Sequence, residues 1–201
     1  MKYNFALGAA LLALLAASPL PANAGSAIAT GPAVVPPSGF IHFCVKHAEE
    51  CLLNGHDATR IELTAARQAE LKDVQTRVNG AIEPREDPTH AWEYAREGQG
   101  DCNTFALTKR RALIALGWPE ETLLLAAVYT ERNEGHLVLV VRTSEGDLVL
   151  DNRLPRIVEW TALPYRWVSM QSQASPARWV RVTGESVTTA DSGQSAAVAL
   201  R

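Results

Sequence analysis

The chain has 201 residues, a formal net charge of -3 and 47% hydrophobic residues. It contains no block of lysines and arginines and no basic stripe with interleaved aromatic residues, which excludes the usual classes of proteins that bind nucleic acids or anionic membranes. We therefore expect a globular protein that acts on a protein or peptide, and we expect it to be a monomer.

The N-terminal residues have the pattern of a secretory signal. Lys2 supplies a positive charge, residues 5–15 form a short apolar run, and Ala22-Asn23-Ala24 fits the small-x-small rule for cleavage. The apolar run is shorter than the roughly 20 residues that cross a bilayer, and no later stretch is apolar enough to anchor the chain. The sequence predicts a signal peptide over residues 1–24 and a periplasmic or secreted protein without membrane insertion; an uncleaved N-terminal anchor is the alternative.

The mature chain is long enough for one compact domain. Residues 25–39 contain Pro32, Pro36 and Pro37 and no apolar periodicity, which predicts an extended leader with order beginning near Phe40. Residues 183–201 are rich in Ser, Thr, Ala and Gly and offer no core, which predicts a disordered tail. We place the domain at residues 40–182.

Two helices are predicted in the first part of the domain. Apolar residues recur at helical spacing over residues 63–82, with Thr64 as a capping residue and Pro84 as a stop. A second helix is predicted from Cys102 to Leu116, ended by the glycine and proline that follow. We expect the charged run at residues 109–111 of this helix, Lys-Arg-Arg, largely to face water.

The second part of the domain changes to the period of β-strands. The apolar runs that predict strands are separated by turn-rich segments, and they lie at residues 123–129, 136–143, 148–150, 165–171 and 178–182. Helices followed by an antiparallel sheet predict the α+β class.

Three cysteines leave one unpaired thiol if the chain is exported to an oxidising compartment. Cys44 and Cys51 are close in sequence, whereas Cys102 stands apart. Because seven residues of continuous helix would separate two Cα atoms by roughly 10 Å, a Cys44-Cys51 disulfide requires the chain to turn between them. We predict this disulfide; the alternatives are reduced core cysteines or a zinc site that adds His42 and His47.

Three residues are candidates for nucleophilic catalysis. Cys102 opens a predicted helix, where free N-H groups and the positive end of the helix dipole favour the thiolate. His136 starts an apolar strand after a turn, and Asp151 ends the next strand. Each residue taken alone has an ordinary structural interpretation, as a buried cysteine, a turn residue and a strand-end cap.

The hairpin formed by the strands at 136–143 and 148–150 brings His136 and Asp151 to the same end of the sheet. With the turn centred on Glu145-Gly146, His136 lies opposite Pro155, and Asp151 points to the same face because it is an even number of residues away. Four residues of strand span roughly 13 Å, so a bulge, a shifted turn or a diagonal contact has to close the gap.

Several short motifs of the chain occur together in a known family. They are Gly98-Gln99-Gly100-Asp101-Cys102, Ala106-Leu107 with Lys109-Arg110, Leu116-Gly117-Trp118-Pro119, Gly135-His136, Leu150-Asp151-Asn152, and upstream Val78-Asn79, Trp92 and the segments around Cys44 and Cys51. In these residues and in the order Cys, His, Asp, the chain resembles the LapG-type bacterial transglutaminase-like cysteine peptidases over nearly the whole mature domain.

The resemblance implies a papain/transglutaminase-like fold and a cysteine peptidase in which Cys102 is the nucleophile, His136 the general base and Asp151 the residue that orients the imidazole. It makes Trp92 a candidate substrate-binding residue, and it implies limited proteolysis of a protein substrate, as in LapG-type adhesin processing. Two alternatives stay open: transglutaminase or amidase acyl transfer by the same three residues, and a non-catalytic protein-binding module.

The sequence departs from the family at the residues after the nucleophile. Members commonly have acidic residues there, implicated in calcium binding, whereas this chain has Asn103 and Thr104. Calcium needs several oxygen ligands, mostly charged, to bind tightly. We therefore predict no cofactor, although the resemblance alone would imply calcium.

Overall fold

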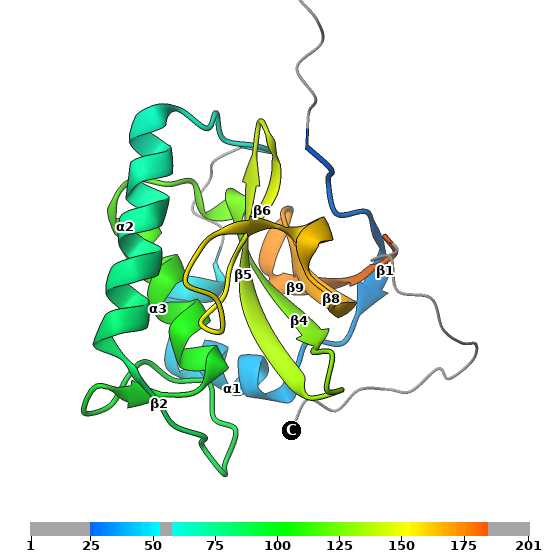
Figure 1. Cartoon of the computed structure of the whole chain (residues 1–201). Coiled ribbons are helices and arrows are strands. Elements are labelled where there is room, and N and C mark those ends of the chain that lie inside the picture. Colours follow the sequence, from blue (N-terminus) through cyan, green and yellow to red (C-terminus); the bar gives the residue numbers. More distant parts are fainter. Residues whose placement is uncertain (1–24, 53–57, 185–201) are drawn as a thin grey trace, which may run out of the picture.

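A computed structural model describes residues 25–52 and 58–184 (Figure 1). The predicted signal peptide and residues 185–201 of the predicted tail lie outside this part of the chain. The described residues contain an antiparallel sheet of seven strands in the order β1-β9-β8-β4-β5-β6-β7. The strands are β1 Thr30–Val34, β4 Leu123–Tyr129, β5 Gly135–Thr143, β6 Gly146–Leu150, β7 Val158–Glu159, β8 Arg166–Ser172 and β9 Ser175–Val182.

The helices lie before the central strands in the chain and pack on one side of the sheet. They are α1 Ser38–Lys46, α2 Ala65–Ala81 and α3 Cys102–Ala115, joined in part by the short parallel pair β2 Glu83–Pro84 and β3 Gln99–Gly100. α3 packs directly on β5, and α2 packs against α3 (Figure 1). This arrangement confirms the predicted α+β class. No helix within the described ranges is long and apolar enough to cross a membrane.

The central strands β4 and β5 are buried on both faces, which their continuous apolar sequences predict. Alternate residues serve two cores: Leu125 and Leu139 belong to the core shared with the helices, whereas Leu124 and Val140 belong to the core on the opposite face. The predicted strand at 123–129 coincides with β4. His136, near the start of β5, is held by the pairing of this strand with β4, where it lies opposite Val128.

The segment predicted as a leader contributes to the fold. β1 is an edge strand that pairs with β9, with Val34 opposite Trp179, and Ile28 is 3% exposed. Gly31 and Pro32 are tolerated in this strand because one side of an edge strand needs no backbone donors. The pairing register with β9 shifts at these two residues, between Thr30 and Ala33. The ordered chain therefore begins before Phe40, contrary to our expectation.

The predicted disulfide is present. α1 ends at Lys46, the chain turns through the short 3-10 helix Ala48–Cys51, and the Cα atoms of Cys44 and Cys51 lie 5.7 Å apart. The bond removes both thiols from the zinc site considered above and rules out two reduced core cysteines. Cys102 is the free cysteine.

Two residues of the charged run on α3, Lys109 and Arg110, are buried where we expected them to face water, whereas Arg111 is exposed as expected. Arg110 is 2% exposed and bonds the Leu123 carbonyl and the Glu120 carboxylate, both at 3.2 Å. Lys109 is fully buried beneath the sheet, and its Nζ has no hydrogen-bond partner among the described residues. Burial lowers the pKa of Lys109 to about 7, although the charge of Asp151 opposes this shift. The prediction was wrong for Lys109 because the face of α3 that packs on β5 includes position 109.

We predict that Lys109→Met is more stable than the wild type at pH 7 and that this advantage shrinks as the pH rises to about 10. The unfolded chain binds a proton at Lys109 in that window that the folded chain does not, so the wild type gains up to about 1.4 kcal/mol per pH unit relative to the variant. Urea unfolding of both proteins across this range measures the difference. An advantage that does not change with pH would contradict a deprotonating Lys109.

Candidate active site

The nucleophile candidate lies at a capped helix start. Asp101 is the N-cap of α3, and its Oδ1 accepts hydrogen bonds from the backbone N-H groups of Asn103 (3.0 Å) and Thr104 (3.2 Å). Cys102 is the first helical residue and is partly exposed. Gly100 allows β3 to enter this turn, because a Cβ at this position would lie 2.4 Å from the Thr104 side chain.

His136 and Asp151 are in direct contact. The β5–β6 hairpin pairs Thr143 with Gly146, so its turn is one position earlier than we assumed from sequence. Continuing this register puts His136 opposite Arg153, and Asp151 becomes its diagonal neighbour on the same face. His136 Nε2 lies 2.9 Å from Asp151 Oδ1. The shifted turn and the diagonal contact thus close the gap that the sequence left open.

The electrostatics of this contact favour a charged imidazole. Burial opposes the charge, but the hydrogen bond and charge of Asp151, together with a hydrogen bond to the Cys102 side chain, raise the pKa of His136 to about 9. Burial would likewise raise the pKa of Asp151, but the His136 interaction outweighs it and the pKa is lowered. Since Nε2 faces Asp151, the ring nitrogen left for Cys102 is Nδ1.

The cysteine and the histidine open into one cleft of about 370 Å³. One wall is formed by the segment from Pro84 to His90, and the other by Thr130 and Glu134 between β4 and β5. Asn152 and Arg153, which follow Asp151, also line it. The cleft leaves room for an extended chain to pass over Cys102.

Sequence reasoning missed several residues that hold Asp151. Tyr165 donates a hydrogen bond to Asp151 Oδ2 at 2.6 Å, and the backbone N-H of Arg153 donates to Oδ1 at 2.9 Å. On α2, the side-chain amides of Gln75 and Asn79 donate to the Asp151 carbonyl. Of these residues, Asn79 could have been identified from the sequence, because it belongs to the motifs of the resemblance described above. No pattern in the sequence around the other three predicts a contact with Asp151.

Trp92 lies in the core and not in the cleft. It is 5% exposed, and its ring packs edge-on against Phe40 and Trp179, with centroids 5.6 Å and 6.0 Å away. It does not line the cleft that contains Cys102. Its large apolar surface favours a packing role, and a contact with substrate stays a prediction.

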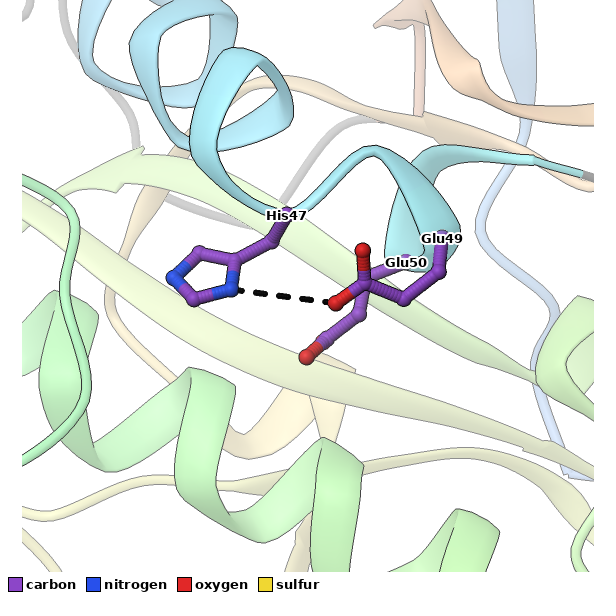
Figure 2. A group of neighbouring side chains, drawn as sticks. All are labelled: His47, Glu49 and Glu50. Carbon is purple, nitrogen blue, oxygen red and sulfur yellow. Dashed lines mark ion pairs between the residues drawn. The ribbon is translucent and has the colours of Figure 1, made fainter.

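A second group of polar side chains lies on the short helix after α1. Figure 2 shows the His47 ring directed toward Glu49 and Glu50. Their ligand atoms are close enough to share a metal ion, and His47 Nδ1 lies 3.8 Å from Glu49. However, Glu50 already accepts hydrogen bonds from Tyr94 and from Arg111, the latter at 2.6 Å. We therefore assign this group a structural role, holding the disulfide-bonded segment against α3.

Comparison with models of protein families identifies a family for this chain. The model of the bacterial transglutaminase-like cysteine proteinases (BTLCP) matches residues 30–187, a range that includes every strand and helix from β1 to β9. No curated protein matches the sequence.

The comparison with solved structures finds the LapG protein of Legionella pneumophila. One structure is 26% identical with a TM-score of 0.46, and the match covers 54% of this chain and 65% of that one. The calcium-bound form is 23% identical with a TM-score of 0.49, covering 64% and 77%. The EGTA-treated form is 24% identical with a TM-score of 0.47, covering 62% and 71%.

We predict that iodoacetamide alkylates Cys102 in the native, unreduced protein, because this thiol is free and lies in an open cleft at a helix N-terminus. Cys44 and Cys51 should stay unmodified until a reductant is added. Peptide mass mapping after alkylation identifies the labelled residue. Labelling of Cys102 that requires denaturation would contradict an accessible nucleophile.

Proposed function

Because the chain belongs to the bacterial transglutaminase-like cysteine proteinase family, we propose that it hydrolyses a peptide bond of a protein substrate with Cys102, His136 and Asp151. The observation that supports these roles is the 2.9 Å contact between the buried His136 and Asp151, with Cys102 lining the same cleft as His136. A cysteine, a base and a group that orients the base form the arrangement required for acyl transfer.

The first half of the proposed reaction forms an acyl-enzyme. Transfer of the Cys102 proton to His136 gives a thiolate and an imidazolium, and the charge of Asp151 stabilises the latter. The thiolate Sγ attacks the peptide carbonyl carbon, and a C-S bond forms. The imidazolium then gives its proton to the leaving amine as the C-N bond breaks.

The helix start supplies a donor for the developing oxyanion. The Asp101 carboxylate accepts from the N-H groups of residues 103 and 104 and not from that of Cys102. The Cys102 N-H, at the positive end of α3, is thus left to donate to the oxygen of the tetrahedral intermediate.

The second half releases the acid product. His136 takes a proton from a water molecule, the hydroxide attacks the thioester carbonyl, and the C-S bond breaks to return the thiolate. We propose limited proteolysis of an exported protein, as the resemblance to LapG-type peptidases implies, in the periplasm or outside the cell.

The residues present do not fit a calcium site beside the nucleophile. Asp101 Oδ2 accepts a hydrogen bond from the Asn103 side-chain amide at 3.0 Å, and Oδ1 accepts the two capping N-H groups. Positions 103 and 104 offer a neutral amide and a hydroxyl, and neither adds the negative charge on which tight calcium binding depends. The Asn103 amide satisfies the carboxylate from within the chain, so we assign calcium no role.

We predict that Cys102→Ala and His136→Ala each abolish cleavage of a protein substrate. Asp151→Asn should lower kcat by up to about 10⁴-fold, the loss seen when the equivalent aspartate of a serine protease is changed, because an amide cannot stabilise the imidazolium. The double variant Cys102→Ala/His136→Ala should be little worse than either single one, since the residues act as a unit. Cleavage rates of each purified variant measure these effects.

Circular dichroism and thermal melting serve as the folding controls for these variants. Wild-type activity in Cys102→Ala would refute the mechanism. Full activity in Asp151→Asn would assign the orientation of His136 to another group. Release of an amine-conjugated product in place of the free acid would indicate transamidation.

We predict that removal of divalent cations leaves the enzyme active. Activity and melting temperature should be the same after dialysis against EGTA as in the presence of calcium, because Asp101 is already satisfied by Asn103. An EGTA-sensitive activity that calcium restores would show that a cation is bound despite the substituted residues.

A further inference from the structure

Both carboxylate oxygens of Asp151 are occupied by donors. His136 and the Arg153 N-H lie on Oδ1, each at 2.9 Å, and the Tyr165 hydroxyl donates to Oδ2 at 2.6 Å. Asp151 is 1% exposed. Inside the protein, water does not compete for these positions, so the protein groups alone set the orientation of the carboxylate.

Tyr165 contacts two members of the proposed catalytic group. It lies between the 3-10 helix Trp160–Ala162 and β8, and it is 2% exposed. Its ring meets the ring of His136 edge-on, with centroids 5.9 Å apart and an interplanar angle of 76°. The Arg153 guanidinium also donates to its hydroxyl, at 3.2 Å.

We propose that Tyr165 is a positioning residue that fixes the rotation of the Asp151 carboxylate so that Oδ1 stays on His136. This inference rests on the proposed function of the three catalytic residues. The terminal torsion of an aspartate is broad and two-fold, so a carboxylate is not oriented by its own rotamer preference. A short O-H···O⁻ bond to the second oxygen supplies the missing constraint.

The backbone of Asp151 is fixed independently of Tyr165. Gln75 and Asn79 on α2 donate to the Asp151 carbonyl at 2.8 and 3.3 Å, and both also donate to the Leu154 carbonyl. Because these amides hold the turn in place, loss of the Tyr165 hydroxyl should free the carboxylate without moving the main chain.

Two charged side chains interact with Asp151. His136 faces it from β5, and the charge of Lys109 on α3 interacts with it. Arg153, in the turn after β6, reaches Asp151 through its backbone N-H, and its guanidinium is paired with Glu131 at 2.5 Å. Tyr165 is a neutral side-chain donor, so replacing it leaves the charge of the site unchanged.

Tyr165→Phe is the test, since it removes the hydroxyl and keeps the ring. We expect kcat to fall about tenfold, within the range for second-layer partners of functional groups, with KM little changed. Weaker stabilisation of the imidazolium lowers the pKa of His136, so the basic limb of the kcat/KM profile should move to lower pH. The rate of Cys102 alkylation near neutral pH should fall, because a larger share of the Cys102–His136 pair is then the neutral thiol and imidazole.

Tyr94→Phe is the matched control. Tyr94 also donates its hydroxyl to a carboxylate, that of Glu50, but it does not line the cleft with Cys102. This variant should retain the wild-type pH profile. It separates the effect of losing any tyrosine–carboxylate bond from the effect of losing the one at Asp151.

The double variant Asp151→Asn/Tyr165→Phe shows whether Tyr165 acts through Asp151. It should be no slower than Asp151→Asn alone, because the carboxylate to be positioned is already gone. An unchanged basic limb in Tyr165→Phe, additive losses in the double variant, or failure of Tyr165→Phe to fold would each overturn the positioning role. Failure of the proposed roles of the catalytic residues gives a distinguishable result, because the single variant Asp151→Asn would then keep full activity.

Discussion

The buried carboxylate of Asp151 is the constraint on which the arrangement of the site depends. A charge that is 1% exposed has to be satisfied by donors from within the protein. These donors come from β5, from the turn after β6 and from the segment before β8, while α2 holds the carbonyl of the same residue. Satisfying one group therefore fixes four segments relative to one another.

The helix that starts at Cys102, the proposed nucleophile, is anchored by a second set of charges, of which Arg110 is buried and Arg111 is exposed. Arg110, in the middle of α3, is bound to the Leu123 carbonyl and to Glu120, which ties the helix to the start of β4. Arg111 pairs with Glu50, the residue before Cys51 of the disulfide. The disulfide-bonded segment thus anchors the helix whose first residue is Cys102, at a distance from the reacting atoms.

Features that depend on neighbouring residues could be predicted from the sequence. The helix capped by Thr64 and the strand at 123–129 follow from apolar periodicity and capping, both of which act over a few residues. β1 could not be predicted this way, because an edge strand with Gly31 and Pro32 has no periodic pattern and is defined by its pairing with β9, about 150 residues away in the chain. Lys109 shows the same limit, since its charge predicts exposure and only the packing of α3 on β5 buries it.

The sequence by itself determined which residue types stand at the start of a helix, at the start of a strand and at the end of the next strand. These positions, with the family motifs, identified Cys102, His136 and Asp151 as candidates. The tertiary structure decided that His136 and Asp151 touch, because a one-position shift of the hairpin turn moves a side chain by several ångströms along its partner. It also decided that Tyr165 faces Asp151, since a contact between residues of two separate connecting segments leaves no trace in the local sequence pattern.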